Sequence, residues 1–211
     1  MFQLDYGQHI PAFLHPWIAK IKDVPRDGHC GFKCIALAVG LKDKDFKDGA
    51  AMEVRKALSR DLYNQKDRYS RLIGGEVAFK EACAMLLVEK DAKFGPEKWL
   101  SKWSHGQVIA NLYERVVLFI QAEPSECTTF LPCGTPYPSK YPPIVLVWVN
   151  RNHWVLGYVA ADQDETMPFP PVSTSWMKSR SMPADFKRPW IGHVKDGIEK
   201  WEELVKEAEE Q

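Results

Sequence analysis

The chain has 211 residues, of which 45% are hydrophobic and 27% are charged, and its formal net charge is zero. This length is enough for one domain with a buried core, and the balanced charge gives no electrostatic footprint for nucleic acid or an anionic membrane. No apolar stretch approaches the ~20 residues that span a bilayer, and the N-terminus lacks the pattern of a signal peptide. We therefore expect a monomeric intracellular protein, cytoplasmic or nuclear, without nucleic-acid or membrane partners.

Three helices are predicted in the first half of the chain. The first 22 residues mix aromatic residues with prolines and predict an irregular arm or a short helix, and residues 23–28 are rich in turn formers. Apolar residues at helical spacing then predict helices over 30–39, 50–65 and 76–87. The last of these helices follows the Gly74-Gly75 break.

The second half of the chain contains the strands. Ser104 is a candidate cap for a helix that ends near Tyr113, and the apolar run 116–120 has the character of a strand. A short strand is also possible in the segment CTTFLP. The clearest β signal is a hairpin over 144–150 and 153–160, joined by a tight Asn-containing turn.

Proline-rich segments and a charged helix complete the chain. Residues 132–143 predict a loop that can cover a sheet edge, and residues 167–189 predict coil along the surface. The charged amphipathic sequence from 197 to the end predicts a solvated surface helix. Helices precede strands without regular βαβ alternation, so we expect an α+β fold.

Five cysteines occur, at positions 30, 34, 83, 127 and 133. The odd number and scattered placement do not predict a disulfide framework. Cys30 and Cys34 are separated by three residues, but no His-x-x-x-His motif follows them, and Cys127 and Cys133 form only a weak soft-metal pair. We expect neither a metal nor a cofactor.

The sequence DGHCGFKCIA places Cys30 between glycines, where a predicted helix begins. Backbone N–H groups at a helix N-terminus stabilise an anion, and a thiolate there has a pKa well below the usual value. Two readings of Cys30 follow: a reactive nucleophile, or a small buried hydrophobic residue, which is the commonest fate of a free cysteine.

A nucleophilic cysteine needs a base, and His153 is the best candidate among the six histidines. It opens a strongly hydrophobic strand directly after a polar turn, where a rigid sheet would hold it. The alternative is a strand-end histidine that only bonds to a loop. Packing, capping or entrance-lining roles are expected for the others: His9, His15, His29, His105 and His193.

These segments together resemble the ovarian tumour (OTU) family of cysteine proteases. The stretch D27-G28-H29-C30-G31-F32 resembles the family's nucleophile motif, and N152-H153-W154 after an apolar strand resembles its histidine motif. The segments around V54-R55-K56-A57-L58 and W103-S104-H105-G106-Q107 resemble its intervening helices. The match covers about residues 20 to 160, and its local character is most similar to divergent members from mobile elements or viruses.

The resemblance implies a papain-like α+β fold of OTU type, with a small central sheet between helices. It divides the chain into an N-terminal arm (1–22), a catalytic domain (23–161) and a Pro-rich segment with a C-terminal helix (162–211). It implies that Cys30 is the nucleophile, His153 is the base and Asp27 supports the nucleophile loop, whose amides would form an oxyanion hole. His29, Gly31 and Trp154 are the expected substrate-binding residues.

The third member of the triad is the main departure from the family pattern. Many members place an Asp or Asn two residues after the histidine, and that position is Val155 here. Either the site is a Cys–His dyad, or another residue orients the imidazole. We rank Asn150 and Asn152, which flank the turn, ahead of Asp5 and Asp23.

The resemblance also implies a function: hydrolysis of peptide or isopeptide bonds after the C-terminal glycine of ubiquitin or a ubiquitin-like protein. Residues 66–75 and 132–143 are candidates for contact with the globular body of that substrate. Aromatic residues can wall the groove for its tail, although we expect at least two of four tryptophans to be buried: Trp99, Trp103, Trp148 and Trp154. A polyprotein-processing protease and a catalytically silent ubiquitin-binding module remain as alternatives.

Overall fold

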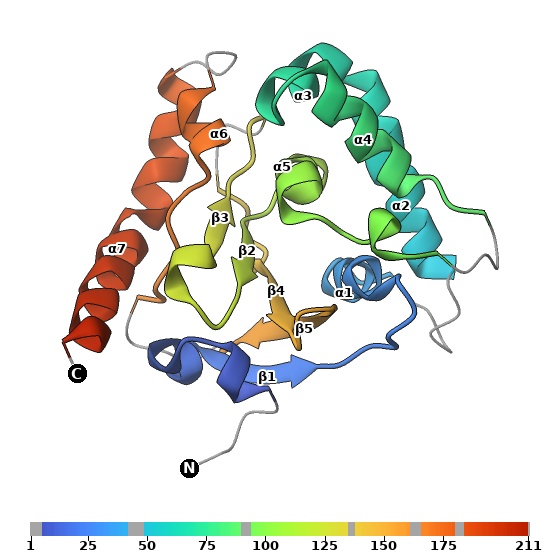
Figure 1. Cartoon of the computed structure of the whole chain (residues 1–211). Helices are drawn as coiled ribbons and strands as arrows, with labels where there is room; N and C mark the ends of the chain where they lie inside the picture. The colour runs from blue at the N-terminus through green and yellow to red at the C-terminus, as the bar shows by residue number, and fades with distance from the viewer. Residues whose placement is uncertain are drawn as a thin grey trace.

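The computed structural model describes residues 6–41, 49–89, 94–134, 138–160, 166–179 and 184–210. Its centre is a five-stranded mixed sheet in the order β1-β5-β4-β2-β3 (Figure 1). The strands are β1 (Ile18–Lys22), β2 (Val117–Ile120), β3 (Thr128–Phe130), β4 (Ile144–Val149) and β5 (His153–Val159). Only β2 and β4 pair in parallel, whereas the other neighbours are antiparallel.

Helices cover the sheet on both sides, which confirms the predicted α+β class (Figure 1). The described helices are α1 (Cys30–Ala38), α2 (Gly49–Asn64), α3 (Lys66–Leu72), α4 (Glu76–Leu86), α5 (Lys102–Tyr113), α6 (Thr174–Lys178) and α7 (Ala184–Glu209), with short 3₁₀ helices η1 (Gly7–His9), η2 (Ala12–Trp17), η3 (Pro96–Lys98) and η4 (Pro124–Glu126). The helix α1, which begins at Cys30, packs against both β5 and α2. No helix in the described part of the chain is long and apolar enough to cross a membrane.

The central strands are apolar because both of their faces are covered. Every residue of β2 is buried, and β4 has one half-buried residue, Trp148. Runs of this kind are typical of strands packed on both sides, as predicted from the sequence. The hairpin β4–β5 is also confirmed: Asn150 and Arg151 both have positive φ angles, of 52° and 58°. Two residues in this left-handed region fit the twist of a tight hairpin.

The N-terminal segment differs from the prediction of an irregular arm or a short helix. It forms η1 and η2, but residues 18–22 add the edge strand β1 to the sheet by antiparallel pairing with β5. Its burial pattern is that of an edge strand, with Ile18 and Ile21 buried and the intervening residues exposed. Two apolar residues in five positions give too weak a period for a strand prediction.

Two helix boundaries also differ from the sequence prediction. The cap of α5 is Ser101, whose hydroxyl accepts the Ser104 N–H at 3.3 Å, so the helix begins earlier than a Ser104 cap implies. The predicted surface coil over 167–189 contains α6 and the first turns of α7, although residues 180–183 lie outside the described residues. Proline at position 189 made the helix hard to predict there.

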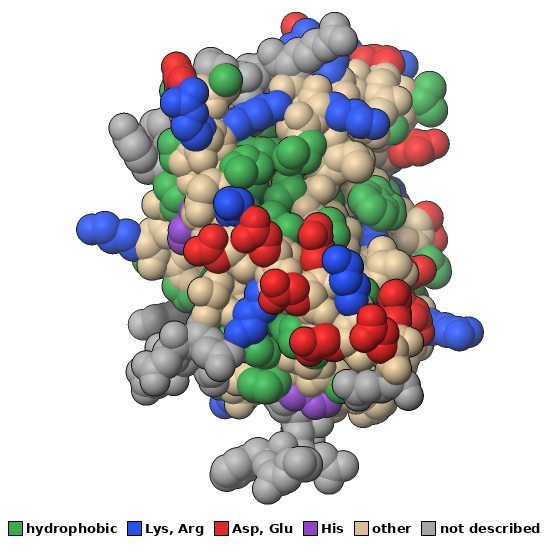
Figure 2. Space-filling view, turned by 90° about the vertical axis from the view of Figure 1, so that its left-hand side faces the viewer, with side chains coloured by type: hydrophobic (Ala, Val, Ile, Leu, Met, Phe, Trp, Pro, Cys, Tyr) green, Lys and Arg blue, Asp and Glu red, His purple; other side chains and the backbone are tan. Residues whose placement is uncertain are grey.

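The long helix α7 lies along one side of the molecule, opposite α1 and α2 in Figure 1. It buries Trp190, Val194 and Trp201 and turns its charged side outward. Figure 2 shows this face, on which acidic side chains gather below a hydrophobic area. The exposed acidic residues of α7 itself include Asp196, Glu199, Glu202, Glu203, Glu207 and Glu209.

Candidate active site

Cys30 is the first residue of α1 and follows a turn in which Gly28 has a φ angle of +82°. Only glycine adopts that backbone conformation readily, which explains its place two residues before the cysteine. The Sγ atom of Cys30 faces β5, because the backbone N–H of Trp154 donates to it at 3.5 Å. The fold thus brings together positions 124 residues apart, as the sequence analysis required.

His153 is the first residue of β5 and is fully buried, with 0% of its side chain exposed. Its Nε2 atom lies 2.7 Å from Oδ1 of Asp23. Its Nδ1 atom is buried and has no hydrogen-bond partner among the described residues. Trp154, the next residue, donates its backbone N–H to the Cys30 thiol, so the fold brings the start of β5 to the cysteine.

Asp23 immediately follows β1 and orients the histidine. Besides His153, it accepts the Val24 N–H on Oδ1 at 2.7 Å and the Tyr6 hydroxyl on Oδ2 at 2.5 Å. Burial acts to raise the pKa of Asp23, but hydrogen bonds from Tyr6, His153 and Val24 outweigh it, so the pKa lies below its usual value. The carboxylate is therefore charged at neutral pH and stabilises a protonated imidazole.

The ranking of Asn150 and Asn152 above Asp23 is wrong for the contact with His153. The Oδ1 atom of Asn150 instead accepts a hydrogen bond from Nε2 of His9 at 3.0 Å. Asn152 lies in the turn before β5 and lines a cavity beside Cys30. Asp5 lies outside the described residues. Sequence reasoning could not rank Asp23 first because nothing local connects it to a histidine 130 positions away.

The expected low pKa of Cys30 is not observed. Burial raises the pKa of the Cys30 thiol above its usual value, and the nearby carboxylate of Asp27 acts in the same direction, while the N–H groups of Trp154 and Gly31 lower it. The helix terminus by itself would lower the pKa of the thiol, but the loss of water around the buried sulfur outweighs that effect. Formation of a thiolate therefore depends on a proton acceptor next to it.

Asp27 contacts both the loop before Cys30 and the first turn of α1. Its Oδ1 accepts the N–H of His29 at 3.0 Å, and its Oδ2 forms an ion pair with Lys33, which is buried. Lys33 lies one helical turn after Cys30, so the pair ties the loop before the nucleophile to the first turn of α1.

Arg55 of α2 is a second support that sequence reasoning did not identify. Its guanidinium is buried, with 1% of the residue exposed, and donates to the carbonyls of Gly28, Met85 and Lys98 at 3.3, 2.9 and 2.9 Å. Its Nε donates to Nδ1 of His29 at 3.1 Å. An arginine in an otherwise amphipathic helix gives no signal of this role, because its partners are carbonyls from other segments.

The three residues expected to bind substrate make packing contacts in the structure. His29 is buried and lies 4.8 Å from the ring of Phe94. A Cβ on Gly31 would approach Leu100 to 2.6 Å, so this glycine permits close packing of α1. The Trp154 indole is buried and donates to the Leu100 carbonyl at 3.1 Å. The His29 and Trp154 side chains and the Gly31 backbone therefore belong to the core next to Cys30.

The space beside the nucleophile is a cavity of about 110 Å³. It is lined by Cys30 together with Arg26, Gly28, Trp99 and Asn152. Of the four tryptophans considered for the groove, only Trp154 is buried, so the expectation that at least two of them are buried is wrong. Trp99 and Trp148 are half-buried with ring centroids 6.5 Å apart, and Trp99 forms one wall of the cavity.

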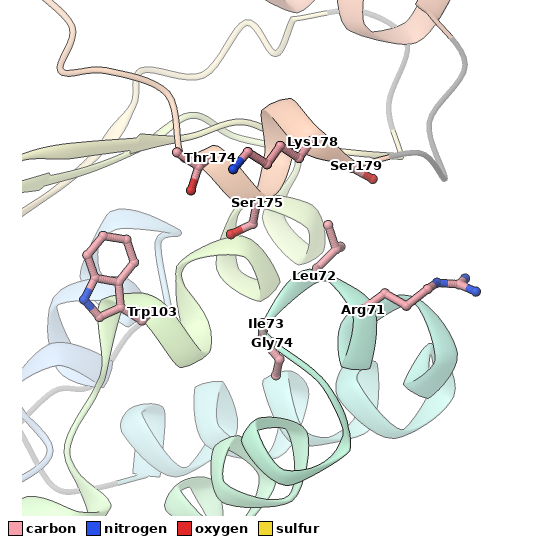
Figure 3. A pocket seen from close by; sticks show the side chains of 9 residues that line it. All are labelled: Arg71, Leu72, Ile73, Gly74, Trp103, Thr174, Ser175, Lys178 and Ser179. Atoms are coloured by element: carbon pink, nitrogen blue, oxygen red, sulfur yellow. The ribbon is translucent and has the colours of Figure 1, made fainter.

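A larger cavity, of about 710 Å³, lies away from these residues, between α6, the end of α3 and the start of α5 (Figure 3). It is lined by Arg71, Leu72, Ile73, Gly74, Trp103, Thr174, Ser175, Lys178 and Ser179. Trp103, 60% exposed, stands at one end of it. Part of the stretch 66–75, a candidate contact for a substrate body, thus borders an open hollow.

The other four cysteines are buried and less suited to nucleophilic chemistry. Burial raises the pKa of Cys127 to about 12 and that of Cys133 to about 11, and it also raises the pKa values of Cys34 and Cys83. In the part of the chain that the structure describes, no group of three or more His, Cys, Asp or Glu side chains could hold a metal ion.

Comparison with known proteins does not assign the chain to a family. No protein-family model matches the chain, and no curated protein is significantly similar to it.

Proposed function

We propose that the protein is a cysteine protease of the OTU type that cleaves after the C-terminal glycine of ubiquitin or a ubiquitin-like protein. One observation supports the catalytic part above all others. Asp23, Cys30 and His153 come from three separate segments. Asp23 binds Nε2 of the imidazole, Nδ1 has no hydrogen-bond partner among the described residues, and the backbone N–H of the residue after His153 donates to the Cys30 thiol. This order of acid, imidazole and nucleophile is the arrangement that activates serine and cysteine nucleophiles.

The first half of the reaction forms a thioester. Nδ1 of His153 takes the proton from the Cys30 thiol, and the resulting thiolate attacks the carbonyl carbon of the scissile bond. Asp23 stabilises the imidazolium through Nε2. The imidazolium then gives its Nδ1 proton to the leaving amine, the C–N bond breaks, and the acyl group remains on Cys30.

The second half regenerates the thiol. Nδ1 of His153 takes a proton from water, whose oxygen attacks the thioester carbonyl, and the C–S bond breaks as the proton returns to sulfur. The N–H of Cys30 lies in the first turn of α1, where backbone donors have no helical acceptor, and it is available to the negatively charged oxygen of each tetrahedral intermediate. This donor is fixed by the helix before substrate arrives.

The choice of a glycine-ended substrate rests on the resemblance of the sequence motifs and on the size of the cavity. A space of about 110 Å³ walled by Trp99 has little room for a large side chain next to the scissile carbonyl. An extended tail that ends in glycine, as in ubiquitin, fits such a constriction. A protease for a different glycine-containing sequence, such as a polyprotein site, is the second candidate.

The test uses ubiquitin with a C-terminal electrophile, and it compares wild type with Cys30→Ala, His153→Ala and Cys83→Ala. We expect a covalent adduct in wild type and Cys83→Ala, none in Cys30→Ala, and adduct formation at least about 100-fold slower in His153→Ala. Gel shift and mass mapping report the adduct and its site.

Alkylation by iodoacetamide separates the alternatives because it needs no protein substrate. If Cys30 reacts faster than the other four cysteines but ignores the ubiquitin probe, the enzyme is a cysteine protease with another target. If Cys30 reacts no faster than Cys83 at neutral pH, the catalytic proposal fails and a silent module is favoured.

A further inference from the structure

We propose that Tyr6 is a positioning residue of the site, whose hydroxyl holds the Asp23 carboxylate in the orientation at which it binds His153. This inference rests on the proposed catalytic role of Cys30 and His153. It assigns to the N-terminal segment a part in the reaction that neither the sequence motifs nor the resemblance provide.

The first argument is the exposure of Asp23. Its side chain is 48% exposed, whereas the histidine that it orients is fully buried. A surface carboxylate exchanges its partners with water and rotates, unless other bonds fix it. Here the two oxygens are held from different segments: Oδ1 by Val24 and His153, and Oδ2 by the Tyr6 hydroxyl at 2.5 Å. Removal of the Tyr6 bond would free Oδ2 and allow the carboxylate to turn away from the imidazole.

The second argument is that Tyr6 is itself held in place. It has a φ angle of 64°, a conformation that residues with large side chains rarely adopt, and its carbonyl accepts the N–H of His9 at 2.9 Å. Backbone of this kind persists where surrounding contacts determine it, and it is common at functional sites. On the other side, Arg26 donates to the Tyr6 hydroxyl at 3.4 Å.

The third argument is that the same segment holds the turn before the catalytic histidine. His9, three residues after Tyr6, binds Asn150 at 3.0 Å, and its ring lies 6.4 Å from that of Tyr6. The short helix η1 therefore contacts both the acid that binds His153 and the turn that leads into β5. The hydrogen bond to Asp23 raises the pKa of Tyr6, so the hydroxyl remains a donor throughout the neutral range.

The experiment uses Tyr6→Phe, which removes only the hydroxyl, and Tyr158→Phe as a matched control. Tyr158 lies on β5, and its hydroxyl makes no hydrogen bond to any described residue. The first measurement is the NMR signal of the His153 Nε2 proton in the free protein. We expect this proton to exchange with water at least about tenfold faster in Tyr6→Phe than in wild type and Tyr158→Phe. The second is cleavage of a ubiquitin-derived substrate, with kcat lowered about tenfold and KM unchanged in Tyr6→Phe.

A double-mutant cycle tests whether Tyr6 acts through Asp23. In an Asp23→Asn background, the Tyr6→Phe change should slow Cys30 alkylation no further. Equal proton exchange in Tyr6→Phe and Tyr158→Phe, or independent effects of the Tyr6 and Asp23 changes, would overturn the inference. The exchange and alkylation measurements need no protein substrate, so absence of ubiquitin cleavage in wild type counts against the proposed function and not against Tyr6.

Discussion

Asp23 shows how a half-exposed residue acquires a specific role from its neighbours. Its carboxylate is charged, its pKa is lowered by its hydrogen bonds, and Nε2 of His153 lies 2.7 Å away. An Asn at this position would hold the imidazole by a hydrogen bond but would not stabilise its positive charge. In the proposed reaction, the charge of Asp23 therefore matters most at the step in which His153 carries the proton from Cys30.

Asp23→Asn should lower kcat/KM about 100-fold, at the lower end of what general acid–base catalysis contributes, with KM little changed. Asp196→Asn is the matched control, because Asp196 is exposed on α7, away from the site residues and from the candidate substrate contacts. Steady-state hydrolysis of a fluorogenic ubiquitin substrate measures kcat/KM and KM for both variants. A larger loss for Asn150→Ala than for Asp23→Asn would contradict the assignment of Asp23 as the orienting residue.

His105 is a buried histidine with a structural role at the start of α5. Its Nδ1 accepts the Ser101 N–H at 3.2 Å, and its Nε2 lies 3.1 Å from the Ala82 carbonyl. These bonds fit the neutral tautomer with the proton on Nε2, and burial lowers the pKa of His105 to about 4. The packing role expected for this residue agrees with that environment.

This lowered pKa makes stability depend on pH. Between the ordinary histidine pKa of about 6.5 and the folded value of about 4, the unfolded chain binds a proton that the folded protein does not, so acid favours unfolding. From pH 7 to pH 4, His105 should remove about 3 kcal/mol from the free energy of unfolding. Urea denaturation at both pH values measures this loss. His105→Gln, less stable at pH 7, should lose about 3 kcal/mol less over the same range, and identical losses in both proteins would exclude this role.

At the scale of elements, α2 fixes the turn at Gly28 that precedes Cys30. Arg55 reaches from the buried face of this helix to carbonyls on three segments and to the His29 ring, and its guanidinium carbon lies 3.8 Å from the centre of the Phe32 ring. A planar group with several donors suits this arrangement, whereas a lysine ammonium cannot reach the same acceptors together. Arg55 thus couples the position of Gly28 to the packing of α1 on α2.

Arg55→Lys should therefore lower the free energy of unfolding by about 2–3 kcal/mol, because buried acceptors lose their donors, and should reduce kcat as the turn loosens. Arg60→Lys is the control on the same helix, since Arg60 is exposed, and its effect should stay within about 0.5 kcal/mol. Chemical denaturation and hydrolysis assays report the two effects. If both variants were equally stable, the network around Arg55 would not support the turn.

At the scale of the whole molecule, the C-terminal helix α7 packs against η2 in the N-terminal segment. Trp201 of α7 lies edge-to-face with Phe13 of η2, with ring centroids 5.0 Å apart. The segment that contains Phe13 continues into β1, which pairs with β5, the strand that begins at His153. The C-terminal helix, to which the sequence assigned no chemistry, therefore packs against the segment that leads into β1 and Asp23.

Trp201→Ala should lower the free energy of unfolding by about 3–5 kcal/mol, the cost of removing a large aromatic side chain from a packed core. Trp103→Ala serves as the control, because Trp103 is 60% exposed, and it should change stability by no more than about 0.5 kcal/mol. Urea denaturation of both variants tests the difference. Similar values would show that α7 does not contribute to the core.

The parts of the fold that could be predicted are those that local sequence specifies. Helices α1, α2 and α4 and the β4–β5 hairpin lie within one or two residues of the predicted ranges, because apolar spacing and turn residues act over short distances. The strand β1, the helix α3 and the start of α7 were missed. The helix α3 is mostly polar, the start of α7 contains a proline, and β1 depends on pairing with the distant strand β5.

The sequence by itself determined the identity of the nucleophile and base candidates, Cys30 and His153, through the turn and strand signals around each. Only the tertiary structure decided what surrounds them: Asp23 as the partner of the imidazole, Arg55 behind the turn, and core positions for His29 and Trp154. It also reversed the expected pKa of Cys30, because burial depends on segments far away in the chain. The physical reason is the same in each case: helix and turn signals act between near neighbours, whereas solvation, hydrogen-bond partners and side-chain packing are fixed only when distant segments meet.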